Sequence, residues 1–166
     1  MFVLYATQKL LDRLGSTTTD PLVEPTTSMG NWYATALFWR PQVALFVNEN
    51  TLLPVLVHLA PAQTVLARFV DALAAVLDGL AVPHPLVSRE AELMSDYQLA
   101  KTVNRSVVGM MNEFSYLADA HGRAETTADL LRLSLSSAGT PCGPLRARSG
   151  FPDLEVAALF EPEPNS

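Results

Sequence analysis

Cysteine is almost absent from this chain of 166 residues, in which Cys142 is the only one. A single thiol excludes an internal disulfide framework and a cysteine-rich zinc site, and it fits a reducing compartment, so we expect a cytoplasmic location. Histidine is also scarce. His58, His84 and His121 lie far apart in the sequence and match no metal-ligand spacing, so the sequence predicts no metal site.

Basic residues are outnumbered, with 11 Lys and Arg against 17 Asp and Glu and a formal net charge of −6. This balance argues against a broad nucleic-acid surface but leaves room for a local basic pocket. Long apolar runs are missing as well. The longest, near 43–47 and 52–59, fall well short of the ~20 residues of a membrane span, so we expect no membrane association. The apolar start at 1–5 is too short for a signal peptide.

Apolar residues make up 49% of the chain and charged residues only 17%, which is typical of a globular protein. The length fits one domain. We therefore predict a single domain over residues 1–160. The Glu- and Pro-rich end, residues 161–166, is predicted to be a disordered tail.

Short apolar runs separated by turn residues predict the strands. Three consecutive runs joined by tight turns predict an antiparallel meander: Asn31–Phe38, Val43–Val47 and Thr51–Leu59. Pro54 places the third run at a sheet edge or a bulge. Phe2–Ala6 is predicted to be a further buried strand. Tyr97–Thr102 fits either a strand or the continuation of a helix, and its alternation favours the strand.

Helical periodicity and capping residues predict the helices. The predicted segments run from Gln8 to Leu14 with Gly15 as the stop, from Pro61 to Leu80, and from Leu86 to Met94. A further helix, capped by Asn104 or Thr102, runs to His121, and a last one runs from Thr126 or Thr127 to Ser136, with a short helical turn in 154–160. The predicted fold is α+β, with a small, mainly antiparallel sheet covered by about four helices.

The most informative stretch runs from Lys101 to Ala118. Read as a helix, it has an apolar face that should pack on the sheet and a polar face that carries Arg105, Gly109, Asn112 and Tyr116. The apolar face includes Val107, Met110, Met111 and Phe114.

The start of this helix is the candidate ligand site. Helix N-termini attract anions, and here Lys101, Asn104, Arg105 and Ser106 crowd that end. Lys9 would join them if the two strand-to-helix junctions lie side by side. With Asn112 included, these residues predict a site for a phosphate or a carboxylate.

A structural interpretation of the same stretch is also available. Asn104 would simply cap the helix, Arg105 would pair with an acid such as Glu113, and Gly109 would let two helices pack closely. For the aromatic run Trp32, Tyr33, Phe38 and Trp39, stacking on nucleic-acid bases is one interpretation. Packing in the core is the favoured one.

Four segments together resemble a family of bacterial conserved proteins with no assigned function. The family pattern reads Cys-Thr-x-Lys-Leu-Leu, Trp-Tyr-Ala-Asn-Leu-Leu, Leu-Phe-Val-Asn-Glu-x-Thr-Leu and Lys-Thr-Asn-Asn-Arg-Ser-Val-Leu-Gly-Ser-Met-Asn-Asp. The counterparts here are 6–11, 32–37, 45–52 and 101–113. Val103, Met110 and Glu113 depart from the pattern, where the family has Asn, Ser and Asp. The resemblance implies a cytoplasmic bacterial protein and supplies no reaction, cofactor or partner.

The sequence contains no phosphate-binding glycine loop, no nucleophile elbow and no paired acids, so no catalytic residue is assigned and no cofactor is predicted. Donors without a nucleophile or base favour a non-enzymatic binding protein. Its partner would be a phosphate-containing small molecule or a nucleic-acid end. One alternative is an enzyme acting on phosphates, of the nuclease or phosphotransferase type. Another is a protein–protein interaction module, such as a homodimer through the aromatic strand with Trp32 or Trp39.

Overall fold

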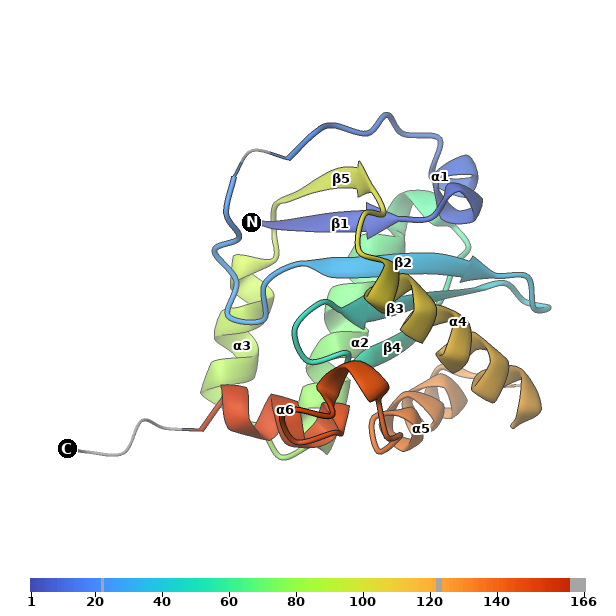
Figure 1. The fold of residues 1–166 in the computed structure, drawn as a ribbon. Helices are drawn as coiled ribbons and strands as arrows, with labels where there is room; N and C mark the ends of the chain where they lie inside the picture. Colours follow the sequence, from blue (N-terminus) through green and yellow to red (C-terminus); the bar gives the residue numbers. More distant parts are fainter. Residues whose placement is uncertain (22, 122–123, 162–166) are drawn as a thin grey trace.

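The computed structural model describes residues 1–21, 23–121 and 124–161, and the predicted tail beyond Glu161 lies outside them. In chain order the elements are β1 (Phe2–Ala6), α1 (Gln8–Leu14), β2 (Trp32–Leu37), β3 (Val43–Asn48), β4 (Pro54–His58), η1 (Ala62–Thr64), α2 (Val65–Gly79), α3 (His84–Leu93), β5 (Tyr97–Lys101), α4 (Arg105–Ala120), α5 (Thr127–Ser137), η2 (Gly143–Leu145) and α6 (Pro152–Leu159). The described residues thus form an α+β fold with more helices than the four expected (Figure 1).

The five strands form one sheet in the order β4-β3-β2-β1-β5. β2, β3 and β4 make the predicted antiparallel meander, in which Ala34 pairs with Phe46. β1, however, runs parallel to both of its neighbours, β2 and β5. The prediction of a mainly antiparallel sheet was therefore wrong in part, because α1 and a long loop carry the chain back to the start of the sheet before β2. The sheet is mixed.

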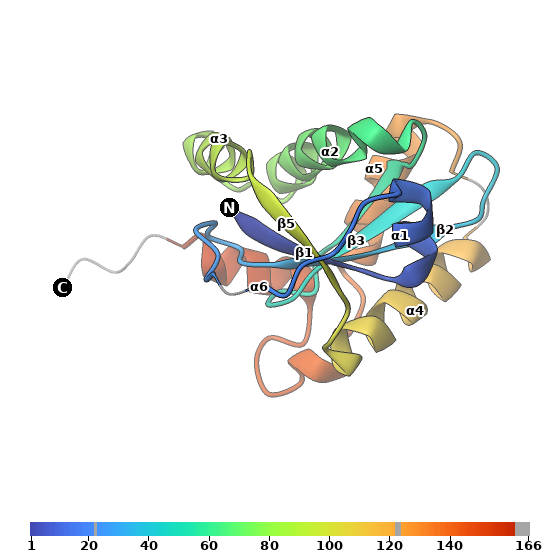
Figure 2. The ribbon, with the colours of Figure 1, turned by 90° about the horizontal axis from the view of Figure 1, so that it is seen from above.

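Each face of the sheet is covered by helices, and alternate strand residues divide between the two faces (Figure 2). On the first face, which we name the α2 face, the Phe69 ring of α2 stacks on Phe46 at 4.0 Å between centroids. On the second face, named the α4 face, Met110 and Phe114 pack against β2 and β3. The predicted orientation of this helix on the sheet is confirmed.

The two edge strands are covered differently. Pro54 opens β4, and β4 is an edge strand as predicted; α5 packs along it. At the other edge, the Thr19 N–H of the loop after α1 donates to Leu99 C=O of β5 at 2.9 Å. Edge groups that would otherwise pair with another chain are thus occupied in part at both edges.

Local signals determine several element ends. Gly15 ends α1 in the left-handed conformation at φ 65°, and Thr126 caps α5 in a reciprocal capping box with Asp129. The strand prediction for Tyr97–Thr102 is confirmed by β5. Two helix starts were misplaced. α3 begins at His84, because Pro85 fits the first turn of a helix and does not interrupt it. α2 begins at Val65 and not at Pro61, because residues 62–64 form the separate 3-10 turn η1.

The aromatic run divides between core and surface. Trp32 is fully buried on the α2 face and Tyr33 is buried on the α4 face, whereas Phe38 beyond the strand is exposed. Because β2 lies inside the sheet, its backbone edges are paired with β1 and β3, and the homodimer hypothesis stays a prediction. No helix within the described residues has the length and hydropathy needed to span a membrane.

Candidate functional site

The junctions after β1 and β5 lie side by side. Ala6 at the end of β1 pairs with Lys101 at the end of β5, and each strand leads directly into a helix. The helices leave toward opposite faces, since Leu10 and Leu11 of α1 pack in the core of the α2 face and α4 packs on the other. In sheets with parallel strands, ligands bind outside the carboxyl ends at such a divergence. This geometry places the start of α4 at that position.

Asn104 caps α4, and its side chain uses part of the helix terminus. The Oδ1 atom accepts from the N–H groups of Ser106 at 2.9 Å and Val107 at 3.3 Å. Within the described chain, the Arg105 N–H makes no hydrogen bond. The capping interpretation of Asn104 is confirmed. An anion would consequently be held by side chains and by the Arg105 N–H more than by the full set of helix N–H groups.

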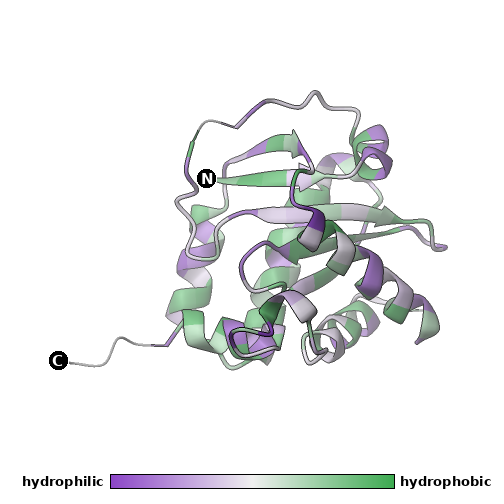
Figure 3. Cartoon of the chain, in the orientation of Figure 1, coloured by the Kyte–Doolittle hydropathy of each residue, from purple (hydrophilic) through white to green (hydrophobic). Residues whose placement is uncertain are grey.

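Lys101, Arg105 and Ser106 are exposed at this end, where Figure 3 shows hydrophilic colouring at the passage from β5 into α4. The predicted pair between Arg105 and an acid such as Glu113 does not form. Across the residues that the structure describes, neither Lys101 nor Arg105 makes an ion pair. Their positive charges therefore face solvent beside the positive end of a helix of four turns.

Two predicted site residues lie apart from this cluster. The Lys9 ammonium stands 5.9 Å from the centroid of the Phe38 ring, beyond the end of β2, although its junction is next to that of α4. Asn112 follows Arg105 by about two helical turns, roughly 10 Å along the axis. The candidate cluster at the start of α4 therefore consists of sequence neighbours, Lys101, Asn104, Arg105 and Ser106.

The polar face of α4 is open. A Cβ atom added to Gly109 would meet nothing within 4 Å among the described residues, so Gly109 does not serve close packing of two helices. Further along the same face Tyr116 is 76% exposed.

Tyr33 contacts the start of α4, and Tyr5 and Glu49 interact with Tyr33; the sequence interpretation missed all three. The Tyr33 hydroxyl accepts from the Asn104 N–H at 3.0 Å, and its ring stacks on Tyr5 at 4.8 Å between centroids. Burial, and then the Glu49 carboxylate, raise the pKa of both phenols. Burial also raises the pKa of Glu49, although hydrogen bonds from Asn31 lower it in part. The available signal was that Tyr33 and Glu49 lie in two of the four family-like segments.

The Cys142 thiol and the potential metal ligands of the described residues form no reactive or metal-binding group. Cys142 is buried, and desolvation raises the pKa of its thiol to about 11, which leaves little thiolate at neutral pH. No group of three metal-ligating side chains comes together in residues 1–21, 23–121 and 124–161.

Comparison with known proteins gives one finding about family. A family model described as a domain of unknown function, DUF6933, matches residues 3–155. Neither the curated proteins nor the solved structures gave a match to the chain. The matched residues span the sheet from Val3 onward, all of α4 and the first half of α6. The chain therefore belongs to the DUF6933 family, a conserved family of unknown function.

Proposed function

We propose that this protein is a non-enzymatic binding protein that holds an anionic ligand, such as a phosphate group, at the start of α4. One observation carries the proposal. The diverging junctions of β1 and β5 present Lys101 and Arg105 at the carboxyl end of the sheet, and neither cation is paired with an acid in the described residues.

Electrostatics supports an anion at this point. The helix dipole adds partial positive charge to two side-chain cations, whereas the chain as a whole carries −6. Arg105 can give a bidentate hydrogen bond to phosphate, Lys101 a point charge, and the Ser106 hydroxyl a further donor. Asn104 keeps its capping role and orients the turn, so it positions the site without contacting the ligand.

The residues at the start of α4 favour binding over catalysis, because they supply hydrogen-bond donors and positive charge. A phosphotransfer site needs a base or a metal-holding set of acids near the phosphate. The carboxyl groups that act on the neighbouring phenols are Glu49, on Tyr33 and Tyr5, and Glu24, on Tyr5. Neither of them, nor any other acid in the described residues, forms an ion pair with Arg105. The ligand class that fits is a phosphomonoester or the phosphorylated end of a nucleic acid.

A thermal-shift comparison tests the proposal. Wild type and Arg105→Ala are heated with inorganic phosphate, nucleotides, short 5′-phosphorylated oligonucleotides and acidic metabolites. A ligand at 100 times its Kd stabilises the folded state by ~2.7 kcal/mol. For a domain of this size, we expect a rise of about 5–10 °C in Tm for wild type. The rise should be lost in Arg105→Ala.

Arg89→Ala is the matched control, because Arg89 is also exposed, lies on α3 and makes no ion pair in the described residues. It should keep the ligand-dependent rise. If no ligand shifts wild type, or if Arg105→Ala responds as wild type does, the start of α4 is not an anion site.

A further inference from the structure

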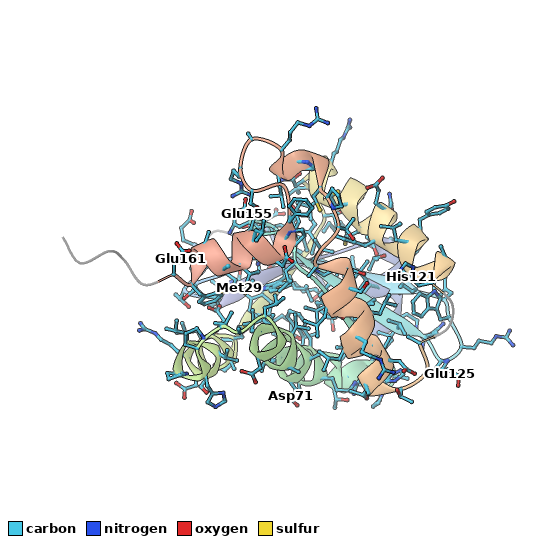
Figure 4. All side chains as sticks on the ribbon, turned by 90° about the horizontal axis from the view of Figure 1, so that it is seen from below. Met29, Asp71, His121, Glu125, Glu155 and Glu161 are labelled. Atoms are coloured by element: carbon cyan, nitrogen blue, oxygen red, sulfur yellow. The ribbon has the colours of Figure 1, made fainter. Side chains whose placement is uncertain are left out.

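A second candidate site lies at the opposite edge of the sheet, where α2 and α5 meet over β4. Figure 4 shows these two helices from below, with Asp71 on the outer side of α2. A cavity of about 270 Å³ opens between them. Leu56 and Val57 both line it, although their side chains belong to opposite faces of the sheet. The cavity therefore reaches the backbone edge of β4.

Where this edge lines the cavity, at Leu56 to His58, its hydrogen bonds leave one donor and one acceptor open. The pairing Asn48 N–H to Leu53 C=O and Leu59 N–H to Gln42 C=O fixes the alternation of β4 against β3. The backbone groups of Leu56 and His58 consequently point away from the sheet. Among the residues that the structure describes, Leu56 C=O and His58 N–H make no hydrogen bond.

The neighbouring edge groups are already occupied. The Ser134 hydroxyl accepts from Leu56 N–H at 2.9 Å, and Arg68 Nε donates to His58 C=O at 3.1 Å. A paired strand needs several successive donors and acceptors, and here a single pair is available. The occupant is therefore a small molecule that presents one acceptor beside one donor, and an added strand does not fit.

The cavity walls define the body of that molecule. Ala72, Ala75 and Val76 of α2 stand on one side, with Leu130 and Leu131 of α5 on the other. The small side chains of the alanines leave the space open, and the apolar walls suit the faces of a flat ring. A volume near 270 Å³ accommodates a heterocyclic base with part of a sugar.

We propose that this cavity binds a flat nitrogen heterocycle of the nucleobase type, edge-on to β4. Leu56 C=O would accept from a ring N–H or an exocyclic amino group of the base, and His58 N–H would donate to the adjacent ring nitrogen or carbonyl, a pairing that base edges offer. Asp71 and Thr127 at the cavity suit sugar hydroxyl groups, and the carboxylate disfavours a phosphate. The Arg68 guanidinium also lines the cavity, but its Nε and Nη2 atoms already donate to His58, Leu59 and Pro61 C=O and are not free to hold a phosphate. The ligand class is thus an uncharged base or nucleoside.

This site is independent of the anion site at α4, because β4 and β5 are the two opposite edges of the sheet. The test uses the full chain labelled with ¹⁵N, titrated with adenosine and with uridine. We expect at least one of them to shift the His58 amide resonance. Its analogue methylated at the donor, N6,N6-dimethyladenosine or 3-methyluridine, should bind at least tenfold more weakly.

Ala72→Leu fills the cavity and should weaken binding at least tenfold, whereas Ala67→Leu on the exposed side of α2 should leave it unchanged. Ala75→Leu replaces Ala72→Leu if the amide spectrum shows that the first variant is unfolded. The proposal is overturned if neither nucleoside shifts His58, if the methylated analogue binds as well as its parent, or if the filled cavity binds as wild type does.

Discussion

A single buried hydroxyl joins α5 to the sheet. Ser134 accepts from Leu56 N–H and donates to Leu130 C=O at 2.8 Å. Ser134→Ala would leave the Leu56 N–H buried without an acceptor, so we expect the free energy of unfolding to fall by about 1–3 kcal/mol. Urea unfolding measures this. Ser136→Ala, at an exposed position on the same helix, should change it by less than about 0.5 kcal/mol. Equal effects of the two variants would contradict this role of Ser134.

Glu49 gives a pH dependence with a defined sign. Burial raises the pKa of its carboxyl above the ordinary 4.5, so the folded state holds a proton that the unfolded state has released. Stability from this group is therefore present at low pH and is lost as the pH rises through the folded pKa. Glu49→Gln removes the titration, and we expect its free energy of unfolding to rise relative to that of wild type as the pH increases above the ordinary pKa of 4.5. Parallel curves for the two proteins would show that Glu49 does not titrate differently on folding.

Within the helices, Gly109 and Gly79 differ in the space available for an added side chain, so alanine substitutions there compare helix propensity with packing. Gly109 lies inside α4 with open space where a side chain would begin, so Gly109→Ala should stabilise the protein by up to ~1 kcal/mol. Gly79→Ala is the matched comparison, because its Cβ would stand 3.0 Å from Leu135 Cδ1 and Cδ2. We expect little or no gain there. Thermal unfolding of both variants checks the difference, and a loss of stability in Gly109→Ala would mean that the face is not open.

At the same scale, elements were predictable wherever a local residue decides the structure. Gly15, Pro54 and Asn104 act through their own backbone or side chain, and each marked an end or an edge correctly. The parallel direction of β1 was not predictable. Phe2–Ala6 is buried along nearly its whole length, so its apolar sequence does not distinguish a parallel from an antiparallel strand. Its partner strand at Tyr97 is also distant in the sequence. Long-range pairing is a property of the whole chain.

For the molecule as a whole, the candidate site was predictable in composition but not in geometry. The sequence identified the helix start with Lys101 and Arg105. The hydrogen bond from Asn104 N–H to the Tyr33 hydroxyl requires β2 to lie beside β1 under the first turn of α4. No local sequence pattern predicts that arrangement. The displacement of Lys9 toward Phe38 likewise depends on where the loop after β2 runs.

The position of β1 between β2 and β5 has a consequence for how the protein folds. β2, β3 and β4 pair with strands that are next to them in the sequence. β1 pairs with β5, so Phe2 can pair with Tyr97 only after the intervening chain has been made. Closing such a long loop costs more entropy than forming a hairpin, so we expect the meander to form first. On a ribosome β1 emerges early and stays unpaired on one side until β5 has been made. The two junctions at the proposed anion site therefore come together only when β5 pairs with β1.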